Sequence, residues 1–267
     1  MKKFMALLLV AGMTLSLTAC GGSTDTAKTD QADVKDTFTV GFDQDFPPFG
    51  YVGDDGEFTG FDIEMATECA ARMGKKIVLQ PIDWDAKDME LEAGTIDCIW
   101  NGFTMNGRED QYTWTDPYMD NSQVIVVKKD SGINTLADLA GKVVEVQKES
   151  AAETALNDEE HADLMASFAQ LLSVGEYNTA FMDLESGAVD AVAIDIGVAQ
   201  FQIEGKEDQY QILDETISSE QYAVGFFLGN TALRDEVQST LLEMVEDSTF
   251  AEISNQYFGY DVCTLGK

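Results

Sequence analysis

The stretch "DPYMDNSQVIVVKKDSGI", residues 116–133, decides the fold, because the order of elements begins again behind it. It places an apolar β run, residues 123–128, between Pro117 and a polar turn. The following "NTLADLAGKVVEVQ", residues 134–147, is typical of a new helix and a new strand. A second α/β unit therefore starts in the middle of the chain.

The residues before this stretch alternate strands with helices. Strands are predicted at "FTVGF" (38–42), "KIVLQPI" (76–82) and "TIDCIWNGF" (95–103), with helices over 61–74 and 85–94 between them. Apolar residues recur every four positions in the first helix, and a glycine closes each helix. This order predicts a parallel sheet with crossover helices.

The residues after it continue the same order. A helix ending at Gly187 leads to an apolar strand over 188–194, and "QYAVGFFL" (221–228) is a further strand. Two helices over 231–247 and 249–259 close the chain. We expect two similar α/β units, of which the middle one interrupts the first.

The N-terminal residues carry the marks of an exported protein. Lys2 and Lys3 precede an apolar run, Phe4–Leu17, that is too short to span a bilayer, and "LTAC" follows. This predicts a signal peptide over 1–19. Its final cysteine looks like that of a bacterial lipobox, so we expect Cys20 to carry lipid. The alternative is an ordinary signal with a chance cysteine.

A polar tether and a strongly acidic body follow. Residues 20–36 are small, polar and free of aromatic side chains, which predicts a flexible segment. The chain has 16 basic and 49 acidic residues, and loss of Lys2 and Lys3 leaves 14 basic ones and a net charge of −35. This balance excludes nucleic acid as a partner, and it means that a bound anion requires a local cation. The arginines are Arg72, Arg108 and Arg234.

The cysteine and histidine content argues against a metal site and against nucleophilic catalysis. Cys69, Cys98 and Cys263 lie far apart without a CxxC pattern, so they are interpreted as buried hydrophobes, with one disulfide left possible. His161 sits among acids and is interpreted as a solvated helix residue. We expect no metal, no cofactor and no catalytic residues.

Seven motifs in order resemble one family. "GFDQDFPPFGY", "GFDIEMA", "PIDWD", "GTIDCIWNGFT", "LADLAGKVVEVQ", "DAVAID" and the closing "YFG" are similar to motifs of the polar amino-acid substrate-binding proteins of bacterial ABC importers, the solute-binding family 3. The resemblance covers about Phe38 to Tyr260. It implies an α/β, two-lobed periplasmic-binding-protein-like fold with a hinge of two crossing segments. We place these near 118–122 and 220–223, with lobe 1 over 37–120 plus 223–263 and lobe 2 over 121–222.

The resemblance implies partners for both charges of an amino acid. Arg108, after a strand and a tight turn, matches the arginine that binds the ligand carboxylate with two parallel hydrogen bonds. The alternative is a surface arginine paired with a neighbouring acid. Ser150 matches the second carboxylate anchor, through its N–H and hydroxyl at a helix start. Asp195, at the end of a strand, matches the acid that binds the ammonium, although it could merely cap the next helix.

The sequence departs from the family's pattern at two places. The loop before Arg108 is one residue short, and Gly107 could permit the altered path. Glu149 stands where glycine is common, and its charge would oppose the ligand carboxylate unless the side chain points outward. Among the other acids, Asp62 is interpreted as an N-cap.

The remaining expected ligand-binding residues surround the ligand's side chain and the strand end. Phe46 and Trp84 match aromatic walls, and Asp43 matches the position that reads the far end of the ligand. An aromatic pair with an acid favours a cationic group, so arginine or lysine is expected first, with glutamine, histidine or cystine as alternatives. The set is completed by Asn101, Gly102, Thr104 and Gln147.

These features predict a lipid-anchored receptor at the extracytoplasmic face of the cell membrane. It would be a monomer that delivers a polar L-amino acid to ABC permease subunits and performs no chemistry. One alternative is an enzyme on the same fold, such as a dehydratase, for which Asp43 and Asp195 are the titratable acids in the expected cleft. Another is a surface sensory or adhesion lipoprotein with a protein partner.

Overall fold

The computed structural model describes residues 36–267. The predicted signal peptide, Cys20 and nearly all of the predicted tether lie outside the described residues. The described residues form one compact unit. In the described part of the chain, no helix has both the length and the apolar composition needed to cross a membrane.

Lobe 1 is built on a five-stranded sheet in the order β5-β1-β6-β14-β7. Its strands are β1 (Thr37–Phe42), β5 (Lys76–Pro81), β6 (Cys98–Ile99), β7 (Thr113–Trp114) and β14 (Gly225–Phe226). β1 runs parallel to β5 and β6, as the alternation of strands and helices predicts. β14 is antiparallel to β6 and β7, because the chain enters this strand while returning from lobe 2.

Lobe 2 is built on a six-stranded sheet in the order β10-β9-β11-β8-β12, with β13 also paired to β8. β9, β10 and β11 are parallel, and β8 is antiparallel to β11, β12 and β13. Its strands are β8 (Met119–Lys128), β9 (Val143–Gln147), β10 (Gln170–Val174), β11 (Ala191–Asp195), β12 (Tyr210–Ile212) and β13 (Ser218–Tyr222).

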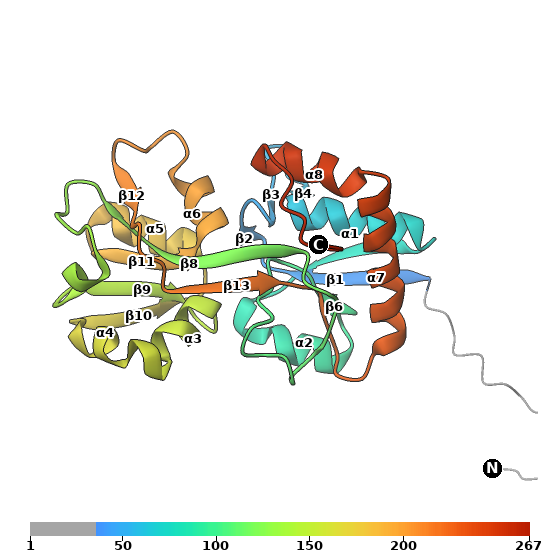
Figure 1. The fold of residues 1–267 in the computed structure, drawn as a ribbon, viewed down its shortest axis with the longest axis horizontal. Coiled ribbons are helices and arrows are strands. Elements are labelled where there is room, and N and C mark those ends of the chain that lie inside the picture. Colours follow the sequence, from blue (N-terminus) through green and yellow to red (C-terminus); the bar gives the residue numbers. More distant parts are fainter. Residues whose placement is uncertain (1–35) are drawn as a thin grey trace, which may run out of the picture. The chain divides into compact units, whose positions relative to one another are not determined.

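Two strands cross between the lobes. β8 and β13 pair antiparallel from Met119 opposite Tyr222 to Gln123 opposite Ser218, and Figure 1 shows both running from one lobe to the other. The predicted crossings near 118–122 and 220–223 overlap these strands. The fold is therefore two-lobed with a two-segment hinge. The predicted lobe boundaries themselves stay a prediction.

Helices cover both faces of each sheet (Figure 1). In lobe 1, α1 and α8 lie on one side and α2 on the other, and α7 runs along the outer end; in lobe 2, α5 and α6 lie on one side and α3 and α4 on the other. The helices are α1 (Phe61–Arg72), α2 (Lys87–Ala93), α3 (Ala151–Asn157), α4 (Ala162–Ser167), α5 (Tyr177–Ser186), α6 (Ile196–Ile203), α7 (Thr231–Glu246) and α8 (Thr249–Phe258).

Short elements complete the fold. Three 3₁₀ helices are η1 (Trp84–Ala86), η2 (Leu136–Leu139) and η3 (Glu159–His161). A small antiparallel sheet after β1 contains β2 (Asp45–Phe46), β3 (Gly50–Val52) and β4 (Phe58–Thr59).

Several sequence expectations differ from the structure in extent. The strand expected over 95–103 is reduced to Cys98–Ile99. The strand expected over 221–228 is divided, so that β13 belongs to the sheet of lobe 2 and β14 to that of lobe 1. This division follows from the hinge, because a segment that passes between lobes cannot pair along its whole length with one sheet. The helix expected over 85–94 begins as η1 and continues as α2.

Aromatic contacts join the two lobes, and Phe46, which takes part in one of them, also lines the pocket described below. Phe46 of lobe 1 lies 6.0 Å from Tyr177 of lobe 2 between ring centroids, and Phe49 meets Tyr222 edge to face at 5.3 Å. The three cysteines of the described chain are buried free thiols, which agrees with their interpretation as small hydrophobes and excludes the possible disulfide among them.

Candidate functional site

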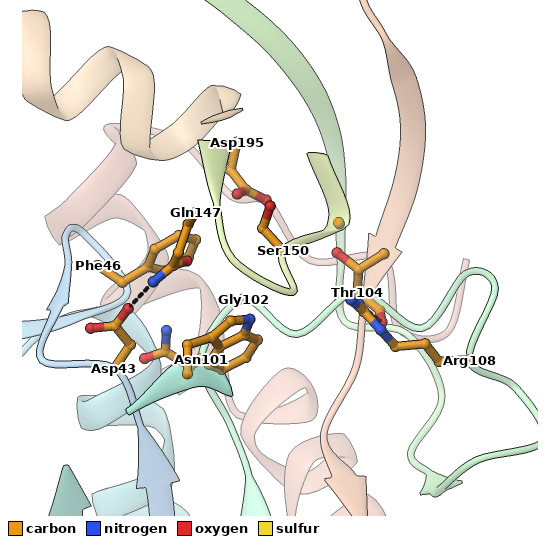
Figure 2. Close-up of a pocket in the computed structure, with 11 residues that line it drawn as sticks. Asp43, Phe46, Asn101, Gly102, Thr104, Arg108, Gln147, Ser150 and Asp195 are labelled. Carbon is orange, nitrogen blue, oxygen red and sulfur yellow. Dashed lines mark hydrogen bonds between the residues drawn. The ribbon is translucent and has the colours of Figure 1, made fainter. Parts of the chain in front are cut away.

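All ten residues predicted to bind a ligand line one pocket, together with Ala151. The pocket lies between the lobes, and its free volume of about 20 Å³ holds no more than about one water molecule, so the cleft is tightly closed in this structure. Its predicted members are Asp43, Phe46, Trp84, Asn101, Gly102, Thr104, Arg108, Gln147, Ser150 and Asp195. In Figure 2, Asp43 and Arg108 lie at opposite ends of this group.

A tight turn brings Arg108 to one end of the pocket. The Arg108 N–H donates to the Met105 carbonyl at 3.0 Å, and Gly107 has φ 77, so this glycine permits the shortened loop. The guanidinium carbon lies 5.4 Å from the centroid of the Phe103 ring, and Nη1 donates to the Thr104 carbonyl at 3.1 Å. No carboxylate within residues 36–267 forms an ion pair with Arg108. The alternative of a neighbouring acidic partner is therefore wrong.

Glu149 adopts the backbone conformation that glycine would favour. Its φ is 58, in the left-handed region, and its carbonyl accepts a hydrogen bond from Arg108 Nη2 at 3.3 Å. The side chain leaves the pocket, with Oε2 lying 3.0 Å from Nζ of Lys87. Lys87 is only 3% exposed and also lies 5.4 Å from the centroid of the Trp84 ring. The negative charge of Glu149 is thus paired with lobe 1.

Ser150 caps α3, as expected. Its Oγ accepts from the Glu153 N–H at 3.1 Å. The Ser150 N–H, however, donates to the Gln147 carbonyl at 3.2 Å, so the expectation that this N–H is available to a ligand does not hold in this conformation. The hydroxyl hydrogen is the donor that Ser150 can still direct at a ligand.

Asp195 ends β11 with its side chain in the pocket and 4% exposed (Figure 2). Its Oδ1 accepts from Gln123 Nε2 at 2.7 Å and from Asn121 Nδ2 at 2.8 Å, and the Tyr222 hydroxyl also donates to it. Burial, followed by the neighbouring charge of Glu220, raises the pKa of Asp195 to about 7. Asp195 also occupies the N-cap position of α6, but its side chain makes no capping hydrogen bond, which contradicts the capping alternative.

Asp43 occupies the far end of the pocket. Gln147 of lobe 2 donates from Nε2 to Asp43 Oδ2 at 2.6 Å and to the Gly175 carbonyl at 2.9 Å (Figure 2). Burial raises the pKa of Asp43 to about 6. Asn101 lies beside this pair, and its Oδ1 is buried without a hydrogen-bond partner among the described residues. The end of the pocket opposite Arg108 therefore offers a ligand mainly hydrogen-bond acceptors, namely the Asp43 carboxylate and Asn101 Oδ1.

Phe46 and Trp84 both line the pocket, from different elements. Phe46 ends β2 and packs on Tyr177, whereas Trp84 begins η1 and packs edge to face on Phe103 at 5.5 Å. Phe46 and Trp84 are not in ring contact with each other within residues 36–267, so they face the pocket as two separate aromatic surfaces.

The strand end of lobe 1 is held by Asp62, which is not the N-cap that the sequence suggests. The N-cap of α1 is Gly60, and Asp62 instead accepts from the Gly102 N–H at 2.5 Å and from the Tyr118 hydroxyl at 2.9 Å. The Gly102 N–H is therefore engaged within the protein. A side chain at Gly102 would meet the rings of Tyr222 and Phe46 within 3.1 Å, which explains a glycine here.

Sequence reasoning missed the polar residues of the hinge. Asn121, Gln123, Glu220 and Tyr222 surround Asp195, and Glu220 is 6% exposed. Asn121, Glu220 and Tyr222 lie within the predicted crossing segments, and Gln123 directly follows the first of them. One signal could have indicated them. A segment that crosses between two lobes is buried, so the polar side chains that it carries need partners nearby.

Comparisons with known proteins identify the family. The sequence profile of the bacterial extracellular solute-binding proteins, family 3, matches residues 38–260. This chain belongs to that family.

Several relatives extend over nearly the whole chain. It is 31% identical to the L-cystine-binding protein TcyJ of Escherichia coli, over 97% of this chain and 94% of that protein. It is 28% identical to the arginine-binding extracellular protein ArtP of Bacillus subtilis, over 97% and 98%. A substrate-binding protein of an ABC uptake transporter from Streptococcus pneumoniae, solved with bound histidine, superposes with a TM-score of 0.82 at 34% identity, over 86% and 95%.

Proposed function

We propose that this protein is the substrate-binding receptor of an amino-acid ABC importer and that it encloses one polar L-amino acid between its lobes. One observation carries the proposal. The same pocket is lined by an arginine without an acidic partner and by two carboxylates, Asp43 and Asp195, without a basic partner among the described residues. Buried charges require partners, and a zwitterion supplies both signs.

Each charge of the amino acid has a counterpart. The Arg108 guanidinium would bind the α-carboxylate through parallel hydrogen bonds, assisted by the Ser150 hydroxyl. Asp195 would bind the α-ammonium. The named relatives support an amino-acid ligand, because their descriptions give cystine, arginine and histidine as bound molecules.

The far end of the pocket favours a side chain that donates hydrogen bonds or carries positive charge. Asp43 supplies a carboxylate, and Asn101 adds a buried acceptor that has no partner in the described chain. Arginine and lysine therefore come first, followed by histidine, glutamine and cystine. Glutamate and aspartate would meet like-charge repulsion at Asp43.

A thermal-shift screen against the twenty amino acids and cystine tests this proposal. A ligand at one hundred times its Kd should stabilise the folded protein by about 2.7 kcal/mol. Failure of every compound to shift the melting temperature would contradict the receptor function and favour a protein partner. Chemical conversion of the bound compound, followed by mass spectrometry, would instead favour the enzyme alternative.

The anchor is a separate part of the proposal. Cys20 would carry the lipid that keeps the receptor at the extracytoplasmic face of the membrane, close to the permease. Replacement of Cys20 by serine should move the protein from the membrane fraction to the soluble fraction and abolish labelling with radioactive palmitate. Unchanged fractionation and labelling would contradict the lipid anchor without affecting ligand binding.

A further inference from the structure

Two buried carboxylates share the same amide donors in the hinge. Asn121 Nδ2 lies 2.8 Å from Asp195 Oδ1 and 2.7 Å from Glu220 Oε1, and Gln123 Nε2 lies 2.7 and 2.8 Å from the same two oxygens. A side-chain amide has two N–H hydrogens, so each amide can serve both carboxylates. This sharing places Asp195 and Glu220 side by side.

The surroundings of the pair are polar, and the nearest positive charge named in the pocket, Arg108, donates to the Thr104 carbonyl at 3.1 Å and is not paired with either carboxylate. The Thr104 hydroxyl donates to Glu220 Oε1 at 2.7 Å, and the Tyr222 hydroxyl donates to Asp195. Tyr177 and Tyr118 are the other titratable groups nearby. Within residues 36–267, no lysine, arginine or histidine forms an ion pair with either carboxylate.

Two like charges in a desolvated site without a cation are unfavourable when both are ionised. The pair can be relieved by one proton or by one ligand cation. Either would reduce the charge of the pair by one unit, and the proton and the ligand cation therefore compete.

We propose that Asp195 and Glu220 act as one site that holds a proton while the cleft lacks a cation and releases it when a ligand ammonium binds. This inference rests on the proposed function. Before binding, the pair carries one proton and the ligand ammonium is in solution. After binding, both carboxylates are ionised, the ammonium is bound beside them and one proton is in solution, so charge and atoms balance.

Glu220 acts here as a positioning residue, because it reaches the pocket through Thr104 and the shared amides. It sets the charge of the pair and makes the site selective for a group with a full positive charge at this end. Its location on β13, opposite Asn121 of β8, also places the proton exchange on the two strands that form the hinge.

Titration calorimetry with L-arginine, or with L-cystine if arginine produces no heat, measures the released proton. Binding enthalpies in phosphate, HEPES and Tris buffers at one pH give the number of protons released. Asp43 can release a second proton on binding a cationic side chain, with a pKa of about 6, so the measurement is made in wild type and in Asp43→Asn. In both proteins, we expect the pair to release about half a proton per bound ligand at pH 7. Below pH 7, we expect the Kd to increase with each unit of falling pH, by a factor that approaches about ten.

The decisive variant is Glu220→Gln, which keeps the acceptor oxygen for Thr104 and removes the second charge. It should release fewer protons than wild type near pH 7 and show a flatter dependence of Kd on pH, because the neighbouring charge is removed while the burial of Asp195 remains. Glu145→Gln is the control, because Glu145 is another buried acid of lobe 2. It should retain the wild-type release.

Three results would overturn the inference. They are binding by wild type without proton release between pH 6 and 7, equal release by Glu220→Gln, or loss of release in Glu145→Gln. The first of these stands even if Glu220→Gln fails to fold. Absence of binding by any amino acid would instead reject the proposed function, so the two failures are distinguishable.

Discussion

The carboxylate of Glu149 lies 3.0 Å from the ammonium of Lys87, across the cleft between the lobes. An acid one residue before Ser150 therefore directs its charge toward the opposite lobe. The backbone of Glu149, at φ 58, has a conformation suited to glycine. The ion pair with Lys87 provides a partner for the charge that glutamate brings to this position.

Lys87→Gln should weaken amino-acid binding severalfold, because the released Glu149 carboxylate would compete with the ligand carboxylate for Arg108. The double variant with Glu149→Gln should recover most of the affinity. The Glu149 side chain is 48% exposed, so a coupling of about 1 kcal/mol is expected from a double-mutant cycle by calorimetry. Additive effects of the two changes would contradict this relationship.

Arg108→Lys should reduce affinity by roughly 2–5 kcal/mol, since the charge remains but the two-pronged donor geometry is lost. Calorimetry on the folded variant gives the value. Arg234→Lys is the matched control, because Arg234 pairs with its neighbour Asp235 and does not line the pocket. Wild-type affinity in Arg108→Lys would remove this residue from the site.

Asp195→Asn should cause a loss of similar size and change ligand preference. Wild type should bind L-arginine much more tightly than its analogue without the α-amino group, and the variant should lose this difference. Asp190→Asn offers a contrast, because Asp190 accepts from the Val143 N–H at 2.9 Å. It should lower the melting temperature and leave preference unchanged; a preserved preference in Asp195→Asn would exclude the ammonium role.

Asp43→Asn should distinguish a cationic ligand from an amide. If the natural ligand is cationic, the variant should lose far more affinity for arginine than for glutamine. Wild-type affinity for arginine should also fall as the pH drops through 6, because burial raises the pKa of Asp43 to about 6 and protonation removes its charge. Equal losses for the two ligands, or binding of glutamate by wild type, would overturn the cationic preference.

The ligand-free protein should be most stable at mildly acidic pH. Burial raises the pKa of Asp62 to about 7, so between about pH 4 and 7 the folded state binds more protons than the unfolded chain. Stability then falls as the pH rises through this window and levels above it. Melting temperatures from pH 4.5 to 8.5 should show a fall of several degrees, with a smaller slope in Asp62→Asn. A melting temperature that rises toward pH 8 would contradict this account.

Much of the site's membership could be predicted because the motifs resemble those of the solute-binding family 3, and because parallel strands present their carboxyl ends at one edge. Strand ends at Asp43, Asn101, Gln147 and Asp195 are visible as apolar runs that stop at a polar residue, and all four line one pocket. The two-lobed order was equally visible, since the α/β pattern restarts after residue 133. The roles of these residues in binding stay predictions.

The remainder depended on pairing between distant segments. Nothing local in "SSEQYAVGFF" indicates that Glu220 shares donors with Asp195, because β13 meets β8 only after the chain has built lobe 2. Asp62 has the local appearance of a helix cap, yet its carboxylate reaches Gly102, 40 residues away. Such contacts are set by tertiary packing, which overrides local preference.

The strand order of lobe 1 also constrains how the chain can fold as it emerges. β14 lies between β6 and β7, so the five-stranded sheet is incomplete until residues 225–226 are available. Lobe 2 takes its strands from one continuous segment, residues 119–222, and can assemble earlier. In a chain delivered from its N-terminus, lobe 2 can therefore assemble before lobe 1, although every residue that lines the pocket has already been delivered once Asp195 arrives.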